Sequence, residues 1–236
     1  MEQNVFVLGL PGSGKSTAAR YIEMLARDYG QAPKLLQDYR ILYDMSLADK
    51  EGKRFSSTLR DGYDGFDVHD FSAFDDALKE LVRQLQEKER TSELNIIEFA
   101  RDDYCKALEL FASRSLTNAF FLFVDAEVET CKQRIKARAA NPQTPDDHYV
   151  SEYIFEAYYS RDHRKYLTLT TACLKGRFHI DEKRIKVVDN TNGVIKQAFL
   201  SQVEEFVTPI LRGQIPTPKR TSYSMDPTQA TTKPTL

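Results

Sequence analysis

The sequence lacks features on which several classes of protein depend. Its three cysteines, Cys105, Cys131 and Cys173, are odd in number and scattered, which predicts reduced thiols with neither a disulfide framework nor a cysteine metal site. The four histidines show no metal-ligand spacing. No apolar run is long enough to span a membrane and no signal peptide precedes the first motif, so we expect a cytoplasmic protein without a membrane partner.

An excess of charge of one sign is also missing. The formal net charge is −2 at pH 7, so no global field recruits nucleic acid, although a local basic patch stays open. What is present is a balanced composition of 236 residues, 41% apolar and 29% charged, which suits one domain over residues 1–212. From residue 213 the chain is mostly polar with several prolines, which predicts a disordered tail over 213–236.

One stretch near the N-terminus has a specific chemistry. Residues 9–17 read Gly-Leu-Pro-Gly-Ser-Gly-Lys-Ser-Thr, a pattern whose successive backbone N–H groups form a nest for an anion. Lys15 is expected to reach the β- and γ-phosphates of a nucleotide, and the hydroxyl of Ser16 to ligate Mg²⁺. The predicted nucleotide-binding residues of this loop are Gly9, Pro11, Gly12, Ser13, Gly14, Lys15, Ser16 and Thr17.

Apolar periodicity supports this interpretation and extends it along the chain. A short apolar run precedes the loop and a helical pattern follows it, as the motif requires. Strand-like runs occur at 4–8, 34–37, 94–99, 120–124 and 185–188, and later helical patterns at 73–89, 104–113, 127–140, 148–171 and 194–206. The alternation predicts an α/β fold with a parallel sheet covered by helices on both faces. Residues 39–72 look irregular, and a long insertion in a compact domain is usually functional or mobile; the alternative is a surface excursion around a small aromatic core.

Parallel α/β sheets bind ligands at the carboxyl ends of their strands, where this sequence places charged residues. Asp38 is the first choice for a general base, Glu98 for an Mg²⁺ ligand or a base, and Arg101 for a clamp on a substrate anion. Structural alternatives stay open. Asp38 could instead start a turn or cap a helix, and Glu98 could pair with Arg101 at the surface.

Basic residues after the fourth strand predict a lid. Arg134 and Arg138 lie four apart on one helix and can converge on a common anion. A proline-broken segment and a second basic helix follow, and a lid-like region over 134–170 would close over ATP and exclude water. The second helix contributes Arg161, Arg164 and Lys165. The alternative is a solvated charged face.

Three segments together resemble the P-loop kinases of the nucleoside and nucleotide kinase group. They are residues 9–17, the run Phe123-Val124-Asp125-Ala126 with the lysine- and arginine-rich segment 131–138 after it, and Val187-Val188-Asp189-Asn190. The resemblance implies a three-layer P-loop NTPase fold with strand order 2-3-1-4-5 and a helical lid. It also implies ATP with Mg²⁺ as the phosphoryl donor, and it places Asp189 and Asn190 near the adenine. By position, the resemblance assigns the binding of the acceptor to the insertion at residues 39–72 and the helix after it.

Three functions remain under consideration from the sequence. The leading one is an ATP-dependent phosphotransferase that moves the γ-phosphoryl group to a nucleoside, nucleotide or other small metabolite. A second is a kinase of nucleic-acid ends, in which Lys53, Arg54 and Arg60 would contact phosphates. A third is a regulatory switch that hydrolyses ATP and docks through its tail; no Asn-Lys-x-Asp motif supports a GTPase. Whether the protein is a monomer or a homodimer stays open.

Overall fold

The computed structural model describes residues 3–87, 94–143, 147–160, 163–191 and 195–215, without the side chains of residues 60 and 163–165. Several residues of the sequence predictions fall outside this description, namely the tail beyond residue 215 and the side chains of Arg60, Arg161, Arg164 and Lys165. None of the described helices combines the length and apolar character needed to cross a membrane.

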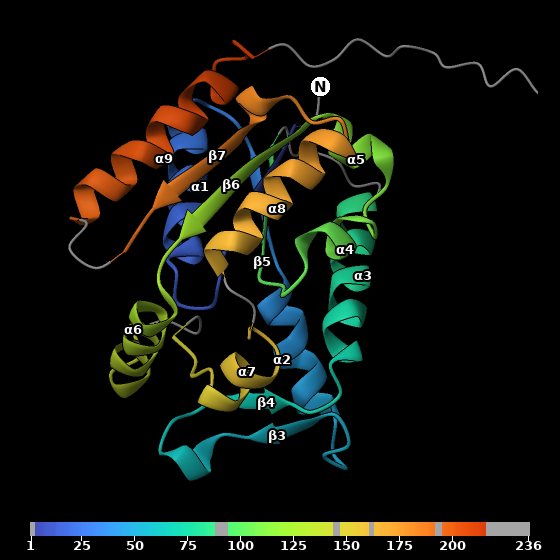
Figure 1. The fold of residues 1–236 in the computed structure, drawn as a ribbon, viewed down its shortest axis with the longest axis vertical. Helices are drawn as coiled ribbons and strands as arrows, with labels where there is room; N and C mark the ends of the chain where they lie inside the picture. The colour runs from blue at the N-terminus through green and yellow to red at the C-terminus, as the bar shows by residue number, and fades with distance from the viewer. Residues whose placement is uncertain (1–2, 88–93, 144–146, 161–162, 192–194, 216–236) are drawn as a thin grey trace, which may run out of the picture.

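Five parallel strands form the central sheet (Figure 1). They are β1 (Gln3–Leu8), β2 (Pro33–Gln37), β5 (Leu94–Phe99), β6 (Ala119–Asp125) and β7 (Ile185–Asp189). Their order across the sheet is β2-β5-β1-β6-β7, which confirms the predicted order 2-3-1-4-5 of a P-loop NTPase fold. Because Val7 of β1 lies opposite Glu98 of β5 and Leu122 of β6, the segments that follow these three strands meet at one edge.

Helices cover both faces of the sheet because alternate strand residues point to opposite sides. On one face Val5 and Val7 share a core with residues of two helices, α1 (Lys15–Asp28) and α9 (Lys196–Leu211). On the other face Phe6 and Leu8 share a core with residues of α3 (Ser72–Gln86), α4 (Tyr104–Leu108), α5 (Ser113–Thr117) and α8 (His163–Gly176). Figure 1 shows α1 and α9 on one side and α3 and α4 on the other.

A third core lies beyond the carboxyl edge of the sheet (Figure 1). Its elements are α2 (Asp38–Ala48), the hairpin of β3 (Phe55–Ser57), η1 (Leu59–Asp61) and β4 (Phe66–Val68), and the helices α6 (Val128–Ala140) and α7 (Glu152–Ala157). The prediction that residues 39–72 are irregular was therefore wrong. Leu42, Phe55 and Val68 are buried in this small core, which only the tertiary packing of short elements creates.

Two predicted helices differ in extent from the helices of the structure. The helix expected over 148–171 is α7, which ends at Ala157, and α8, which begins at His163. Ser151 starts α7 by accepting a hydrogen bond from the N–H of Ile154, which sets the residues before it apart from the helix. The helix expected over 104–113 ends at Leu108 as α4, and the short helix α5, which begins at Ser113, was not predicted. A 3-10 turn, η2 (Glu182–Arg184), precedes β7.

The cysteine prediction was also wrong in part. Cys105 of α4 and Cys173 of α8 form a disulfide, with their Cα atoms 6.4 Å apart, whereas the sequence predicts reduced thiols. The two residues are 68 positions apart, and only the packing of α8 beside α4 brings them together. Cys131 is free and buried, as predicted.

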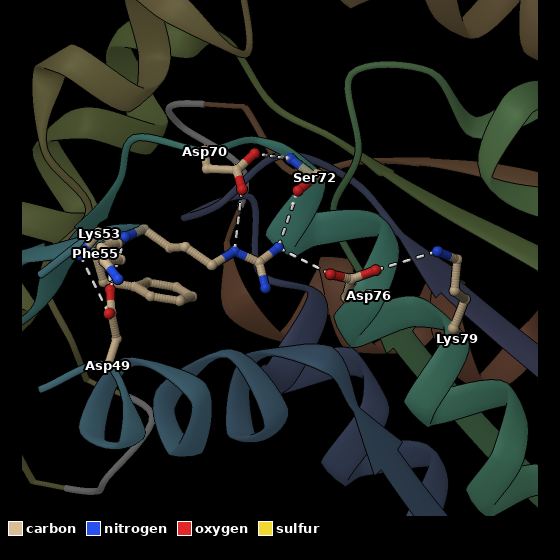
Figure 2. A network of polar contacts seen from close by, with 8 residues as sticks. Asp49, Lys53, Phe55, Asp70, Ser72, Asp76 and Lys79 are labelled. Atoms are coloured by element: carbon tan, nitrogen blue, oxygen red, sulfur yellow. Dashed lines mark hydrogen bonds and ion pairs between the residues drawn. The ribbon is translucent and has the colours of Figure 1, made fainter. Parts of the chain in front are cut away.

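A network of charges fastens the hairpin to α2 and α3 (Figure 2). Asp49, after α2, accepts backbone N–H groups of three consecutive residues, Lys53, Arg54 and Phe55. The guanidinium of Arg54 contacts carboxylate oxygens of Asp70 at 3.1 Å and of Asp76 at 2.9 Å, and it also donates to the hydroxyl of Ser72 at 3.0 Å. Arg54 therefore holds β3 against the start of α3.

Candidate functional site

The phosphate loop packs tightly between the ends of other strands. Gly12 and Gly14 have φ angles of +81° and +108°, a region that residues with a side chain rarely adopt. A Cβ at Gly12 would lie 2.5 Å from the carbonyl oxygen of Cys131, and one at Gly14 would lie 2.5 Å from Nδ2 of Asn190. Both positions therefore require glycine, because a side chain would collide with its neighbours and because the backbone has a positive φ angle. Without side chains at these positions, the loop can present its backbone N–H groups closely to a ligand.

Two residues that follow other strands, Tyr104 at the start of α4 and Asn190 directly after β7, anchor this loop. The N–H of Gly9 donates to the hydroxyl of Tyr104 at 2.8 Å, an anchor that sequence reasoning missed because the pairing is long-range. Asn190 donates through Nδ2 to the carbonyl of Ser13 at 2.7 Å. Asn190 thus lies against the loop, whereas the exposed Asp189 accepts a backbone N–H two residues further on.

Lys15 lies inside the loop and is surrounded by charge. Its side chain is buried, and its ammonium donates to the carbonyl of Leu10 at 3.1 Å. Burial lowers the pKa of Lys15, while the carboxylates of Glu98 and Asp38 act in the opposite direction. The ammonium is therefore bonded to the loop itself, and two carboxylates from other elements add negative charge near it.

Ser16 and Glu98 form the pair that the sequence predicts for Mg²⁺. The Ser16 hydroxyl donates to Oε1 of Glu98 at 2.6 Å, and Nε2 of Gln37 donates to Oε2 at 2.8 Å. Burial raises the pKa of Glu98, and Lys15 and these two donors act against the rise. An alcohol and a carboxylate are oxygen ligands suited to Mg²⁺, so this donor set fits the ion. The neighbouring Thr17 is exposed.

Asp38 and Arg101 form a buried ion pair beside the loop. Asp38 is the first residue of α2, and its Oδ2 accepts from Nη1 of Arg101. The same guanidinium donates to the carbonyls of Ala100 and Phe74, each at 2.6 Å. Asp38 is exposed to 8% and Arg101 to 3%. Arg101 thus faces Asp38 rather than Glu98, and neither Glu98 nor Arg101 lies at the surface.

The phosphate loop and the carboxylates of Asp38 and Glu98 border one cavity of about 610 Å³. The loop residues Pro11, Gly12 and Gly14 through Thr17 line it, together with Asp38 and Glu98, whereas Gly9, Ser13, Arg101 and Asp189 are not among the described lining residues. The lining also contains residues that the sequence did not predict as part of the site, including Arg20, Gln37, Lys196 and Phe199. The structure therefore brings most of the predicted site residues around a single space.

The two lid arginines also line this cavity. Arg134 and Arg138 come from α6, and Arg138 donates through Nη2 to the carbonyl of His148 at 3.4 Å. The charge of Arg138 contributes to the lowered pKa of Lys15. Nη1 of Arg134 is buried and has no hydrogen-bond partner among the described residues. Both guanidinium groups thus add positive charge next to the phosphate loop.

Aromatic side chains form the opposite wall of the cavity. Tyr39 stacks on His148 with their ring centroids 3.4 Å apart, and Phe66 stacks on the same tyrosine at 5.9 Å. Tyr149 and Tyr159 extend the wall. The sequence did not predict this wall, because the 147–160 segment that completes it meets the hairpin only in the folded chain.

The fold and the phosphate loop define a P-loop NTPase with the sheet order of the P-loop kinases. The sequence matches the family described as the AAA domain over residues 5–156, which is more than half of the chain. The chain belongs to this family. No curated protein matches the chain significantly.

Solved structures share this fold at low sequence identity. A gluconokinase from Sinorhizobium meliloti 1021 has a TM-score of 0.51 and 12% identity, with 90% of this chain and 95% of that chain covered. A shikimate kinase from Acinetobacter baumannii, in complex with shikimate, has a TM-score of 0.47 and 13% identity, with coverages of 92% and 97%. The Mycobacterium tuberculosis APS kinase, in complex with AMPPNP and APS, has a TM-score of 0.47 and 14% identity, with coverages of 89% and 97%. At such identities the likeness to the gluconokinase supports the fold alone.

Proposed function

We propose that the protein is a kinase that transfers the γ-phosphoryl group of ATP to a hydroxyl group of a small-molecule acceptor. The observation that carries the proposal is the shared cavity of about 610 Å³, which is bordered by Lys15, Ser16, Glu98 and Asp38 and continues to the aromatic wall at Tyr39. A protein that only hydrolyses nucleotide needs room for the nucleotide and one water molecule, whereas this cavity also extends past Asp38 to the aromatic wall. The space next to a buried carboxylate supports a second substrate.

The donor side of the cavity suits a nucleoside triphosphate with Mg²⁺. The backbone of residues 9–17 holds phosphate oxygens, and Lys15, Arg134 and Arg138 offset their negative charge. Ser16 and Glu98 hold Mg²⁺, which when bound neutralises charge that develops on the phosphoryl oxygens. The strip of Asn190, Lys196 and Phe199 lies beside the loop and offers polar and aromatic contact to the base.

The acceptor side supplies the base for the transfer. The hydroxyl oxygen of the acceptor forms a bond to Pγ, the bond between Pγ and the bridging oxygen of ADP breaks, and the hydroxyl proton passes to the carboxylate of Asp38. Arg101 occupies Oδ2 of Asp38, so the proton is expected at Oδ1. Arg101 is a positioning residue here, because its other contacts are the carbonyls of Ala100 and Phe74.

A kinase of nucleic-acid ends receives less support from the structure. Arg54, one of the basic residues that would contact phosphates, is held by Asp70 and Asp76, and Lys53 pairs with Glu51. Exposed cations already engaged by carboxylates contribute less to binding a polyanion. The third possibility, an ATP-driven switch, would leave the acceptor side of the cavity without a role.

A transfer assay tests the proposal. We expect labelled phosphate to move from ATP to at least one member of a pool of nucleosides, sugars, amino sugars and other hydroxyl metabolites, with 5′-hydroxyl oligonucleotides assayed in parallel. Lys15→Ala should abolish turnover and serves as the control for contaminating kinases. ATP hydrolysis at full rate with no labelled product would contradict the proposal and favour a switch, and labelling of the oligonucleotide alone would favour the nucleic-acid enzyme.

A further inference from the structure

A second cavity of about 950 Å³ adjoins the first on the side of the hairpin. Tyr39, Phe66, Asp147 and His148 line both cavities. The stack of Tyr39 on His148, with ring centroids 3.4 Å apart, therefore lies at the border that the two cavities share. No step of the proposed phosphoryl transfer uses this second cavity.

The walls of the second cavity are rich in aromatic side chains. Tyr39, Tyr43 and Leu47 are spaced by four residues along α2 and lie on one side of that helix. Tyr43 is exposed to 44% and Leu47 to 53%, so both side chains are open to a ligand in this cavity. Phe55 and Phe66, whose rings lie edge to face with centroids 5.6 Å apart, complete the panel from the hairpin.

The charge of the walls changes sign from one cavity to the other. Five cationic side chains line the first cavity among the described residues, namely Lys15, Arg20, Arg134, Arg138 and Lys196, against three carboxylates. Four carboxylates line the second, Asp44, Asp49, Asp64 and Asp147, against the two cations Arg40 and Lys50. A polyanion that enters the second cavity would meet an excess of like charge, whereas an uncharged or cationic group would not.

We propose that the acceptor spans both cavities, with its reacting hydroxyl at Asp38 and an uncharged or cationic distal group on the aromatic panel of Tyr39, Tyr43 and Phe66. The inference rests on the proposed kinase function and narrows its substrate class to hydroxyl compounds without a distal anion, such as amino sugars, amino alcohols or nucleosides. Aromatic faces bind both flat uncharged groups and ammonium groups, and the surrounding carboxylates favour the latter. The stacked rings of Tyr39 and His148 lie where the two parts of the acceptor join.

The experiment compares three classes of acceptor in the transfer assay. The cationic class contains amino sugars and amino alcohols, the uncharged class sugars and nucleosides, and the anionic class sugar acids, sugar phosphates and a 5′-hydroxyl oligonucleotide. We expect the best kcat/KM in the cationic or uncharged class. The acceptor KM is then measured for Tyr43→Ala, which removes a ring that lines only the second cavity. Loss of one such contact should raise this KM about fivefold.

Matched controls separate binding from loss of structure. Tyr29→Ala removes a tyrosine of similar exposure, 41%, that lines neither cavity, and it should leave the acceptor KM unchanged. Asp44→Lys should raise the KM of a cationic acceptor about twofold to fivefold and lower that of an anionic one, while Asp28→Lys, on α1, should do neither. Best turnover with an anionic acceptor, or a KM unchanged in Tyr43→Ala, would overturn the inference. No product from any class would contradict the kinase function itself.

Discussion

The hydroxyl of Ser16 donates to Oε1 of Glu98 at 2.6 Å, although 82 residues separate them in the sequence. The parallel pairing of β1 and β5 explains the contact, because Glu98 lies opposite Val7, just before the phosphate loop. Gln37, at the end of the next strand, donates to the other oxygen of the same carboxylate. Three neighbouring strand ends thus place an oxygen pair suited to Mg²⁺ beside the loop lysine.

Glu98→Gln tests this oxygen pair. The amide has the size of the carboxylate and still offers one oxygen, but it lacks the charge that attracts Mg²⁺. We expect the chain to fold and kcat/KM for ATP to fall by about 10-fold to 100-fold, with part of the loss recovered at high Mg²⁺. Turnover is measured against Mg²⁺ concentration, with the exposed Glu156→Gln as control. A wild-type Mg²⁺ dependence in Glu98→Gln would remove Glu98 from the metal site.

The pH dependence of turnover reports the same carboxylate. Burial raises the pKa of Glu98 above its ordinary value of 4.5, and Mg²⁺ binds the ionised form, so activity should rise with pH at a midpoint above 4.5. Added Mg²⁺ competes with the proton and should move that midpoint to lower pH. Lys15, whose pKa burial lowers from 10.5, should set an alkaline limb below that value, since only its charged form neutralises phosphate.

A rise in pH that ionises Glu98 should increase activity but lower the free energy of unfolding. Its folded pKa exceeds the unfolded one, so this group stabilises the fold at acid pH, and the contribution is lost as pH rises through the folded pKa. Profiles of kcat/KM at two Mg²⁺ concentrations, together with unfolding measured over the same range, check both signs. An acid limb that is unchanged in Glu98→Gln would assign it to another group.

Asp38→Asn tests the proposed base. The amide cannot take the hydroxyl proton, so kcat for transfer should fall by roughly 10²–10⁴-fold while the affinity for ATP is kept. Because the substitution leaves Arg101 without its anionic partner, thermal unfolding must be measured on the same sample. A folded variant with unchanged kcat would show that another group accepts the proton.

Arg101→Met tests the positioning role. The guanidinium is buried between the rings of Phe74 and Phe99, at 5.4 and 5.6 Å from their centroids, and neutralises Asp38. Its loss leaves a buried carboxylate unpaired, which should lower the free energy of unfolding by about 3–5 kcal/mol. The double variant with Asp38→Asn should recover most of this stability in urea denaturation. If the double variant is no more stable than Arg101→Met, the ion pair is not the source of the loss.

Local patterns predicted the parts of the site that depend on chain continuity. The phosphate loop and the five strands follow from a nine-residue motif and from apolar runs, because a buried parallel strand must be apolar on both faces. The order of the strands was implied only by the resemblance to the P-loop kinases. The ion-pair partner of Arg101 could not be predicted from such local patterns. The sequence places this arginine three residues after Glu98, yet the structure pairs it with Asp38 from α2. Spacing along the chain does not determine which strand end a long side chain reaches.

The acceptor side was the least predictable part for a related reason. Residues 39–72 contain a helix and a hairpin of three-residue strands, too short to leave a periodic pattern. Their core forms only when residues such as Tyr149 and Ile154 from a distant segment pack against them. The same dependence on tertiary packing hid the disulfide between Cys105 and Cys173.

Gly12→Ala, with Gly30→Ala as its control, separates strain from collision in the phosphate loop. Both glycines have positive φ, +81° and +75°, so each substitution should cost about 1–2 kcal/mol in backbone strain. Only at Gly12 does the new Cβ collide, 2.5 Å from the carbonyl oxygen of Cys131; at Gly30 nothing lies within 4 Å. Gly12→Ala must therefore displace the loop from α6. We expect it to weaken ATP binding at least about tenfold in calorimetry, the equivalent of 1.4 kcal/mol, while Gly30→Ala binds ATP normally. Equal affinities in the two variants would show that the loop tolerates the shift, and that its contact with α6 does not set the shape of the phosphate site.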